Sequence, residues 1–397
     1  MKALLVHERY IRPGGEDVVF EAEGELLESR GHTVVRFTEE NRRIPEMSSL
    51  VAAGATVWNP TAARRIRSVV RRERPDVVHF HNTFPLISPA AYGAVRAEGV
   101  PVVQTLHNYR LVCPMARLFR DGASCEDCVG KSVPWPGVLH ACYRDSRAAS
   151  AAVSAMLAVH RALGTWRTRV DRYLVLSEFA RELFAEGGLP PDRMVVHPNH
   201  VEPDPGLGPA GGEFALFVGR LDEEKGVDTL LAAWDRMEGV PLRIVGDGPE
   251  AWRVEAAADR NPAVEWTGRL PRAEVLDSMR SARMLIVPSK WYEGWPLVVL
   301  EAFAIGLPVV ASDLGVMVEM VEEGRNGVRF RPGDPAALAK VVEELWGDDA
   351  ALEAMRRHAR AEYEARYTGD AGYRRLMGVY TELLEQAPGR EPAASAR

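Results

Sequence analysis

Residues 288–311 read PSKWYEGWPLVVLEAFAIGLPVVA. The apolar run at residues 284–287 predicts a strand just before this stretch, and Pro-Ser then predicts a turn. A helix is expected at about residues 296–306, followed by a second strand at 307–311. Strand, turn, helix and strand in this succession form the repeating unit of a parallel α/β sheet, which predicts the fold class.

Two carboxylates stand in this stretch, Glu293 just before the helix and Glu301 in its middle. Free backbone N–H groups at a helix start attract anions, so we expect a negatively charged ligand near residues 295–298. An unpaired carboxylate among apolar neighbours would be costly, so Glu301 needs a donor such as a ribose hydroxyl. The alternative is a glutamate paired with a core arginine or lying on an exposed face.

A chain of 397 residues is too long for one compact core and predicts two domains. Its 46% hydrophobic and 26% charged residues are typical of a soluble globular protein. The net charge of −7 does not support nucleic-acid binding. No apolar run is long enough to span a bilayer, and no signal peptide precedes the first strand. We therefore expect a cytoplasmic protein.

The first half begins with a buried strand at residues 3–6, and Gly14 and Gly15 follow in the loop before a helix at about 17–30. Two glycines let the backbone approach a ligand closely or adopt positive φ. The G-x-G-x-x-G dinucleotide pattern is absent. A plain turn between strand and helix is the alternative interpretation.

Two expected strands deliver polar side chains to one edge of the first sheet. His79, His81 and Asn82 end the strand at residues 76–81, and His107 and Asn108 follow the strand at 101–106. Open α/β sheets bind their ligands at the carboxyl ends of the strands. We expect one histidine to be structural, and His107 to be the functional one.

A helix at about residues 61–73 carries five arginines on one side. Such a run is typical of a solvated face. The alternative is peripheral contact with an anionic membrane surface, which would matter for a lipid acceptor.

All the cysteines lie in one segment, spaced C-x11-C-x2-C-x13-C: Cys113, Cys125, Cys128 and Cys142. Four thiolates can complete the shell of a structural zinc, which predicts a small lobe at about residues 111–143. Four unligated thiols are the alternative, since disulfides are disfavoured in a reducing cytoplasm.

Residues 201–212 are rich in proline and glycine and predict a linker, after which a second α/β set begins. Its first strand ends at Gly219, and Arg220 and Lys225 follow closely. Two cations beside a close-approaching backbone suit a diphosphate, whereas a mixed-charge surface loop is the alternative. Gly268 and Arg269 end another strand of this set, and we expect these loops to converge on a cleft facing the first domain.

With these motifs in place, the chain resembles the retaining glycosyltransferases of family 4. The matching segments are PGGE near the start, His107-Asn108, GRLDEEKG, GDGP, the pair Glu293 and Glu301 with LEAFAIGLPVVASD, and NGVRFRPGD. The resemblance implies the GT-B fold, with two Rossmann-like domains whose parallel sheets face each other across a cleft. It places the acceptor domain at residues 1–200, the donor domain at 213–370 and a helix at 371–386 that packs back towards the first domain. The tail at 387–397 is rich in alanine, proline and glycine, and this composition predicts disorder.

The resemblance also implies roles. Glu293 would bind donor-sugar hydroxyls and Glu301 the ribose, while Arg220 and Lys225 would hold the diphosphate. The implied catalytic residues are His107, Glu293, Arg220 and Lys225. The implied donor-binding residues are Gly14, Gly15, Gly219, Arg220, Lys225, Gly268, Arg269, Glu293, Gly294, Trp295, Pro296, Leu297 and Glu301. His81, Asn82 and Asn108 would lie on the acceptor side.

A retaining enzyme of this kind implies front-face transfer, in which a leaving phosphate oxygen takes the acceptor's proton. It requires no cofactor beyond the nucleotide-diphosphate sugar donor, and the acceptor is an unidentified hydroxyl compound. Three alternatives stay open: a sugar-nucleotide 2-epimerase of the same fold, a glycogen-type phosphorylase, and a non-catalytic nucleotide-sugar-binding subunit. The phosphorylase is disfavoured because no lysine stands as a pyridoxal anchor.

Overall fold

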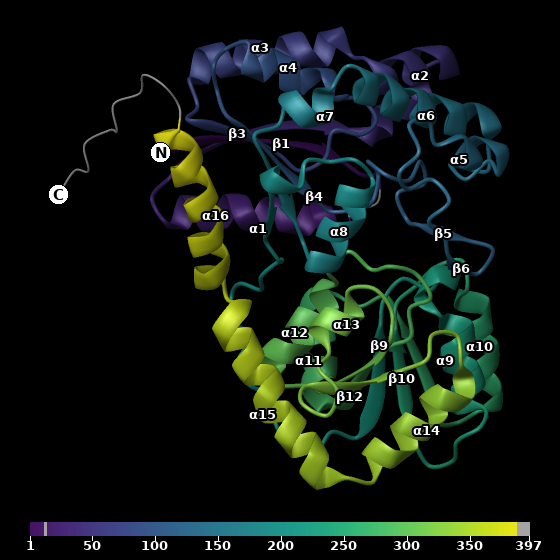
Figure 1. Cartoon of the computed structure of the whole chain (residues 1–397). Coiled ribbons are helices and arrows are strands. Elements are labelled where there is room, and N and C mark those ends of the chain that lie inside the picture. Colours follow the sequence, from purple (N-terminus) through teal and green to yellow (C-terminus); the bar gives the residue numbers. More distant parts are fainter. Residues whose placement is uncertain (12–13, 387–397) are drawn as a thin grey trace. The chain divides into compact units, whose positions relative to one another are not determined.

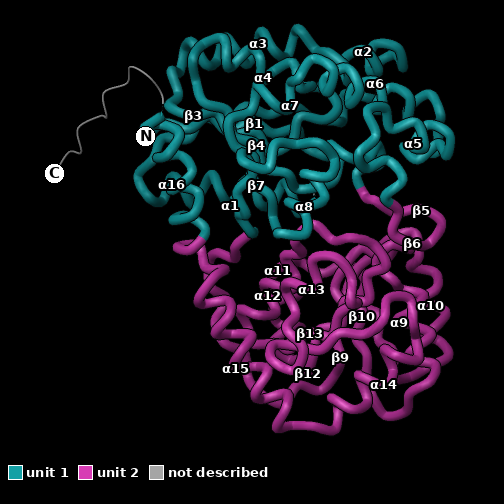
Figure 2. The backbone as a smooth tube through the Cα atoms, in the orientation of Figure 1, with its two compact units in different colours: residues 1–116, 126–198, 372–397 teal, residues 117–125, 199–371 magenta. Residues whose placement is uncertain are grey.

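The computed structural model describes residues 1–11 and 14–386. Its residues fall into two compact units, which Figure 2 colours separately. Unit 1 holds Met1–Ala116, Glu126–Pro198 and the chain from Gly372, and unit 2 holds Arg117–Cys125 and Asn199–Ala371. Pro13 of the PGGE motif and the tail predicted at residues 387–397 lie outside the described residues.

Unit 1 is built on a six-stranded parallel sheet in the order β2-β1-β3-β4-β7-β8. The strands are β1 Lys2–Arg9, β2 Thr33–Glu40, β3 Val77–Phe80, β4 Val102–Leu106, β7 Arg172–Val175 and β8 Met194–Val196. Its helices are α1 Gly15–Ser29, α2 Ser49–Val57, α3 Pro60–Glu73, α4 Ala90–Arg96, α5 Trp135–Leu139, α6 Arg147–Ala162, α7 Thr165–Thr168 and α8 Glu178–Glu186, with short 3-10 helices η1 Asn41–Glu46 and η2 Pro191–Arg193.

The last helix, α16 Gly369–Glu385, packs on the unit 1 sheet beside α1 (Figure 1). Leu376, Val379, Tyr380 and Leu383 recur at helical spacing and join Phe20 of α1 in one buried core cluster. Two segments from opposite ends of the chain therefore cover the same face of this sheet.

Unit 2 has a second six-stranded parallel sheet, in the order β11-β10-β9-β12-β13-β14. Its strands are β9 Phe214–Val218, β10 Leu242–Val245, β11 Val264–Gly268, β12 Ala282–Val287, β13 Val309–Ser312 and β14 Gly327–Phe330. Its helices are α9 Val227–Trp234, α10 Ala251–Arg260, α11 Arg272–Ser281, α12 Leu297–Ile305, α13 Met317–Met320, α14 Pro335–Trp346 and α15 Asp349–Arg366, with η3 Glu223–Lys225. The small hairpin of β5 Phe119–Arg120 and β6 Ala123–Ser124 also belongs to this unit.

Both sheets therefore have the doubly wound α/β topology predicted from the strand–turn–helix–strand segment. Counted along unit 2, the strand order is 3-2-1-4-5-6, as in Rossmann domains. The direction of winding reverses between β9 and β12 in unit 2 and between β1 and β3 in unit 1. Ligands of such sheets bind at the reversal, beyond the carboxyl ends of the strands.

Two segments differ from the predicted layout. Residues 117–125, expected in the cysteine lobe of the first domain, belong to unit 2. There Arg117 donates to both carboxylate oxygens of Glu224, each at 2.9 Å. Residues 201–212, expected as a linker, pack on unit 2 through the Asp204–Arg360 ion pair and the Gly208–Ile305 backbone hydrogen bond. In the described part of the chain, no helix is both long and apolar enough to cross a membrane.

Candidate functional site

The strand-end loops of unit 2 converge at one edge of its sheet, as predicted. The Gly219 N–H donates to the Val245 carbonyl, and the Gly246 N–H donates to the Gly268 carbonyl at 2.8 Å. A Cβ at Gly246 would lie 1.8 Å from the Gly219 carbonyl oxygen, so only glycine allows this approach. The loops after β9, β10 and β11 are therefore fixed against one another.

Lys225 and Glu293 meet at the reversal point of this sheet. Lys225 ends η3 in the loop after β9, and Glu293 lies in the loop after β12. Gly226 follows in the left-handed conformation, φ 72°, and a Cβ at this position would lie 1.9 Å from the Pro288 carbonyl oxygen. This close approach brings the loops together, so that Lys225 Nζ donates to Glu293 Oε1 at 2.7 Å.

The environment of Glu293 keeps its carboxylate charged although the residue is only 5% exposed. Burial raises its pKa, but the Lys225 charge and hydrogen bonds from Lys225 and Ser289 outweigh burial and leave the pKa below its usual value. The Ser289 hydroxyl donates at 2.6 Å to the same Oε1 that Lys225 contacts. The site thus presents a fixed anion and a fixed cation side by side.

Arg220 and Arg269, also predicted for this edge, are exposed. The Arg220 guanidinium pairs with Asp222 and with Glu224, and its side chain is 54% exposed. The mixed-charge loop that the sequence left as an alternative is therefore present, with the Arg220 charge still open to solvent.

The helix of the central segment begins one residue later than expected. Pro296 is extended, φ −68° and ψ 120°, and precedes the first helical residue, Leu297. Gly294 and Trp295 lie in the loop before it, and the Trp295 carbonyl accepts a hydrogen bond from the Asn199 amide at 3.1 Å. The helix ends at Gly306, as predicted, and this glycine has the left-handed conformation.

Glu301 lies in the middle of α12 and is nearly buried. Its Oε1 is 3.1 Å from an Arg272 nitrogen, so it has the arginine partner that the sequence left open. Burial raises the pKa of Glu301, and Arg272 only partly offsets this effect. The Arg272 side chain is half exposed and leaves the carboxylate reachable by a second donor.

In unit 1 the structure brings His81 and His107 into direct contact. His81 Nδ1 lies 3.0 Å from His107 Nε2, and Asn82 and Asn108 line the same small cavity. Burial lowers the pKa of His81 to about 4 and lowers that of His107 as well, so both rings are neutral at pH 7. The Asn108 amide donates to Glu16 at 2.6 Å.

Gly14 and Gly15 stand where α1 begins. Gly14 is extended, φ −122°, and a Cβ placed on either glycine would have no atom within 4 Å. Neither backbone strain nor packing within the described residues explains why these two positions are glycine. The positive φ considered from the sequence does not occur here.

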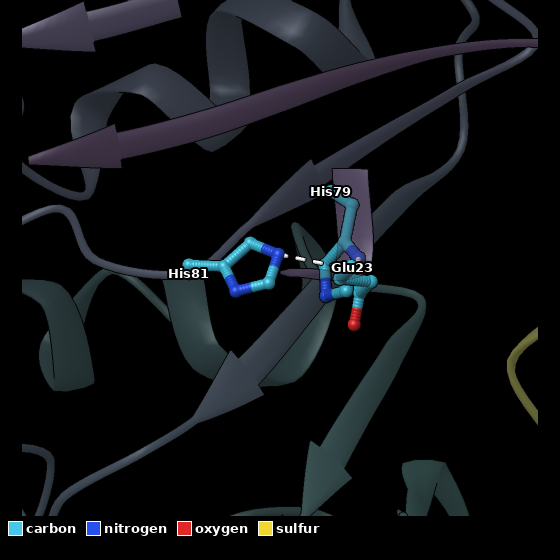
Figure 3. Close-up of side chains that lie close together, drawn as sticks. All are labelled: Glu23, His79 and His81. Atoms are coloured by element: carbon cyan, nitrogen blue, oxygen red, sulfur yellow. Dashed lines mark ion pairs between the residues drawn. The ribbon is translucent and has the colours of Figure 1, made fainter. Parts of the chain in front are cut away.

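A cluster that the sequence did not single out lies behind His81. Glu23 of α1 approaches both His79 and His81, and Figure 3 shows the three side chains converging. His79 also contacts the Tyr380 hydroxyl and the Thr105 hydroxyl, each at 2.7 Å. The signal for Glu23 was present, because it stands on the buried face of α1 between Phe20 and Leu27. No such sequence signal pointed to Tyr380, because it lies far from the histidines along the chain.

The cysteines do not gather in the same way. Across residues 1–11 and 14–386, Glu23, His79 and His81 form the one group of three or more potential ligands whose atoms all lie within 4.8 Å of one another. Cys125 belongs to unit 2, and the other three cysteines to unit 1. A structural zinc on the four thiols stays a prediction.

Family models match most of the chain. Residues 13–205 match the model described as Glycosyltransferase Family 4, and residues 213–348 match that described as Glycosyl transferases group 1. The D-inositol 3-phosphate glycosyltransferase of Acidothermus cellulolyticus is 30% identical, over 97% of this chain and 88% of the relative. The glycogen synthase of Mycobacterium tuberculosis is 30% identical over 73% of this chain, which spans 64% of that relative.

A solved structure agrees with these matches. HepE of Anabaena in complex with UDP superposes with a TM-score of 0.70 at 17% identity, covering 96% of this chain and 100% of that chain. At this identity the structural likeness shows the fold alone. The family assignment rests on the sequence relatives. The chain therefore belongs to glycosyltransferase family 4, and its two parallel α/β units have the GT-B fold.

Proposed function

We propose that this protein transfers a hexose from a nucleotide-diphosphate sugar to an acceptor hydroxyl with retention of anomeric configuration. The Lys225–Glu293 pair at the reversal point of the unit 2 sheet carries this proposal. Its ammonium can neutralise a diphosphate, while its carboxylate can accept hydrogen bonds from sugar hydroxyls. A nucleotide-diphosphate sugar has both a diphosphate and sugar hydroxyls, so it complements both Lys225 and Glu293.

In unit 2, the donor lies along the loops that follow β9, β11 and β12. Glu301 accepts the ribose hydroxyls, and Gly268 with Arg269 holds the base. Lys225 and Arg220 bind the diphosphate, together with the N–H groups at the start of α12. Gly219 and residues 294–297 supply the backbone that approaches the phosphates. The raised pKa of Glu301 supports a carboxylate whose charged form needs a further donor.

In unit 1, Gly14 and Gly15 approach the diphosphate, and His107 stands beside the transferred sugar. The empty space where either glycine would carry a Cβ supports this role, because the chain itself does not fill it. His81, Asn82 and Asn108 lie on the acceptor side. A neutral His107 suits hydrogen bonding to a hydroxyl better than ion pairing.

Transfer then proceeds on one face of the sugar. The bond from the anomeric carbon to the phosphate oxygen breaks, and the acceptor oxygen forms its bond from the same side. The acceptor's proton passes to the leaving phosphate oxygen, whose growing charge Lys225 and Arg220 stabilise. No protein base is required, and the reaction needs no cofactor besides the donor and the acceptor.

UDP is the first nucleotide to test, because the neighbouring HepE structures hold UDP or UDP-glucose. The acceptor is a hydroxyl of a cell-surface polysaccharide, a glycolipid or a natural-product intermediate, and the reaction takes place in the cytoplasm. Contact with the inner membrane surface would use the arginine face of α3. Several of these arginines already have carboxylate partners, Glu39 for Arg65 and Glu98 for Arg67 and Arg71.

Calorimetry with UDP, GDP, ADP and their sugar conjugates tests the donor site. Saturable binding of one nucleotide, weakened in Glu301→Ala, is expected. NMR of the products with a panel of acceptors should show a glycoside with the donor's anomeric configuration. Only an isomerised nucleotide sugar would indicate a 2-epimerase, an inverted product would refute the front-face step, and binding without turnover would favour a non-catalytic subunit.

A further inference from the structure

Two of the unpartnered polar atoms in the core of unit 1 lie in one cluster of side chains. Glu23 Oε1 and His81 Nε2 are both buried and make no hydrogen bond with any described residue. Oε1 lies 2.9 Å from His79 Nδ1 and 3.2 Å from His81 Nε2, but neither approach has hydrogen-bond geometry. Orphaned buried groups are rare in folded proteins and indicate a missing water or ion.

The spacing of these atoms suits a metal ion. Zinc binds imidazole nitrogen and carboxylate oxygen at about 2.0–2.2 Å, which separates tetrahedral ligand atoms by roughly 3.3 Å. The contacts of Glu23 Oε1 at 2.9 and 3.2 Å are close to this separation. All three residues offer ligand atoms within 4.8 Å of one another, and Figure 3 shows the His81 ring turned towards Glu23.

We propose that Glu23, His79 and His81 bind a zinc-type divalent cation through Glu23 Oε1, His79 Nδ1 and His81 Nε2. The Tyr380 hydroxyl, 2.7 Å from His79 Nδ1, offers a further oxygen for a fourth position. Two imidazoles and one carboxylate favour zinc over magnesium or calcium, which prefer oxygen ligands. The site is structural, because its ligands are buried in the core of unit 1.

The outer contacts of both rings fit this assignment. A histidine that binds a metal through one ring nitrogen usually donates from the other to an acceptor. His79 Nε2 lies 2.7 Å from the Thr105 hydroxyl, and His81 Nδ1 lies 3.0 Å from His107 Nε2. Each ring therefore has an acceptor on the side away from the ion.

The ion would connect the sheet of unit 1 to the two helices that cover one of its faces. Glu23 comes from α1 and His79 from β3, while Tyr380 comes from α16. With Nε2 on the metal, His81 must donate from Nδ1, so His107 accepts at Nε2 and carries its own proton on Nδ1. This consequence for the sugar site rests on the proposed role of His107, whereas metal binding does not.

Elemental analysis of the full chain tests the proposal directly. The protein is expressed in zinc-supplemented or cobalt-supplemented medium, because a buried ion enters as the chain folds, and is purified without chelators. About one ion per chain is expected. The cobalt protein should show visible ligand-field bands without sulfur-to-cobalt charge transfer.

Variants identify the ligands. Glu23→Gln should reduce bound metal at least about tenfold, whereas Glu28→Gln, the same change at an exposed position of α1, should retain it. The double variant Cys125→Ser/Cys128→Ser should also retain it. A metal-free wild type, or metal lost only from the cysteine variant, would overturn the proposal even if Glu23→Gln failed to fold. None of these readouts depends on sugar transfer, and UDP binding tests the donor site separately.

Discussion

The two sheets present different side chains at the carboxyl ends of their strands. In unit 2, Glu293 pairs with Lys225 at 2.7 Å, so an anion and a cation stand together beside loops held by glycine. In unit 1, His81 and His107 meet as neutral rings. The same doubly wound topology therefore provides a charged edge with the Lys225–Glu293 ion pair in one unit and a pair of neutral imidazoles in the other.

This difference separates two tasks of a glycosyl transfer. The leaving diphosphate gains negative charge as the bond to the sugar breaks, and only fixed cations stabilise that change strongly. Sugar and acceptor hydroxyls stay neutral, so hydrogen bonds suffice to orient them. We infer that the ion pair of unit 2 can stabilise charge that develops on a leaving diphosphate, whereas the imidazole pair of unit 1 can orient neutral hydroxyls.

The largest expected effect comes from removing the cation of the charged edge. Lys225→Ala should lower kcat about a hundredfold or more, because the ammonium acts on charge that develops in the transition state. His107→Gln should cost only about tenfold, the worth of a neutral hydrogen bond. Turnover with the identified donor and acceptor measures both.

A nearby lysine provides the control for this pair. Lys290 lies one residue after Ser289 but pairs with Asp228 at 2.9 Å, so Lys290→Ala should keep nearly normal turnover. Equal losses in Lys225→Ala and His107→Gln would contradict the division of tasks between the ion pair and the imidazole pair. Thermal melts of all three variants exclude losses caused by unfolding.

The next effect concerns the nucleotide. Glu301→Ala should weaken UDP binding by about tenfold, because hydrogen bonds to a charged group contribute roughly 1.5–3 kcal/mol. Arg272→Ala serves as the matched variant, since it removes the partner seen at 3.1 Å but keeps the carboxylate. If Arg272→Ala weakened UDP binding as much as Glu301→Ala, the pair would be structural and the ribose contact would be wrong.

Substitutions at Gly226 and Gly15 are expected to affect stability and ligand binding differently. Gly226→Ala should destabilise unit 2 by more than about 2 kcal/mol, because the new Cβ would lie 1.9 Å from the Pro288 carbonyl oxygen at φ 72°. Gly15→Ala should leave stability within about 1 kcal/mol, since nothing in the chain lies within 4 Å of the new Cβ and α1 gains a better helix former.

For Gly15→Ala we expect ligand binding, rather than stability, to change. If the space beside it admits the diphosphate, Gly15→Ala should weaken UDP-sugar binding severalfold without lowering the melting temperature. Calorimetry and thermal unfolding of the same samples separate the two quantities. Unchanged binding would favour the alternative interpretation, in which the two glycines form a plain turn between strand and helix.

Much of the unit 2 edge was predictable because parallel strands align their carboxyl ends. Glycine at the ends of β9 and β11, cations after β9 and carboxylates after β12 had to meet at one edge. The direct Lys225–Glu293 bond was not predictable, since it depends on how closely Gly226 lets its loop approach Pro288. Sequence patterns indicate an edge but not the distance between two loops.

The buried cluster of unit 1 shows where such reasoning ends. His79 and His81 were expected on one strand, yet their contacts depend on Glu23 and Tyr380 from helices at opposite ends of the chain. Periodicity predicts that α1 and α16 bury one face each, but not that these faces cover the same side of one sheet. Residues 117–125 likewise contact unit 2 through an ion pair, Arg117 with Glu224, that no local pattern encodes.

The smallest expected effect is a pH dependence of nucleotide binding. Burial raises the pKa of Glu301, with Arg272 as a partial offset, so its carboxylate becomes protonated at milder acidity than an ordinary glutamate. Ribose hydroxyls donate to the ionised form, so UDP affinity should be full above this pKa and fall a few-fold as pH decreases through it. Glu293 should not add to this change, because its pKa is lowered and it stays charged until the solution is more acidic. Calorimetry between neutral and mildly acidic pH should show the decrease in wild type and not in Glu301→Gln, whose amide does not titrate. A decrease of the same size in Glu301→Gln would assign the titration to another group and remove the ribose role from Glu301.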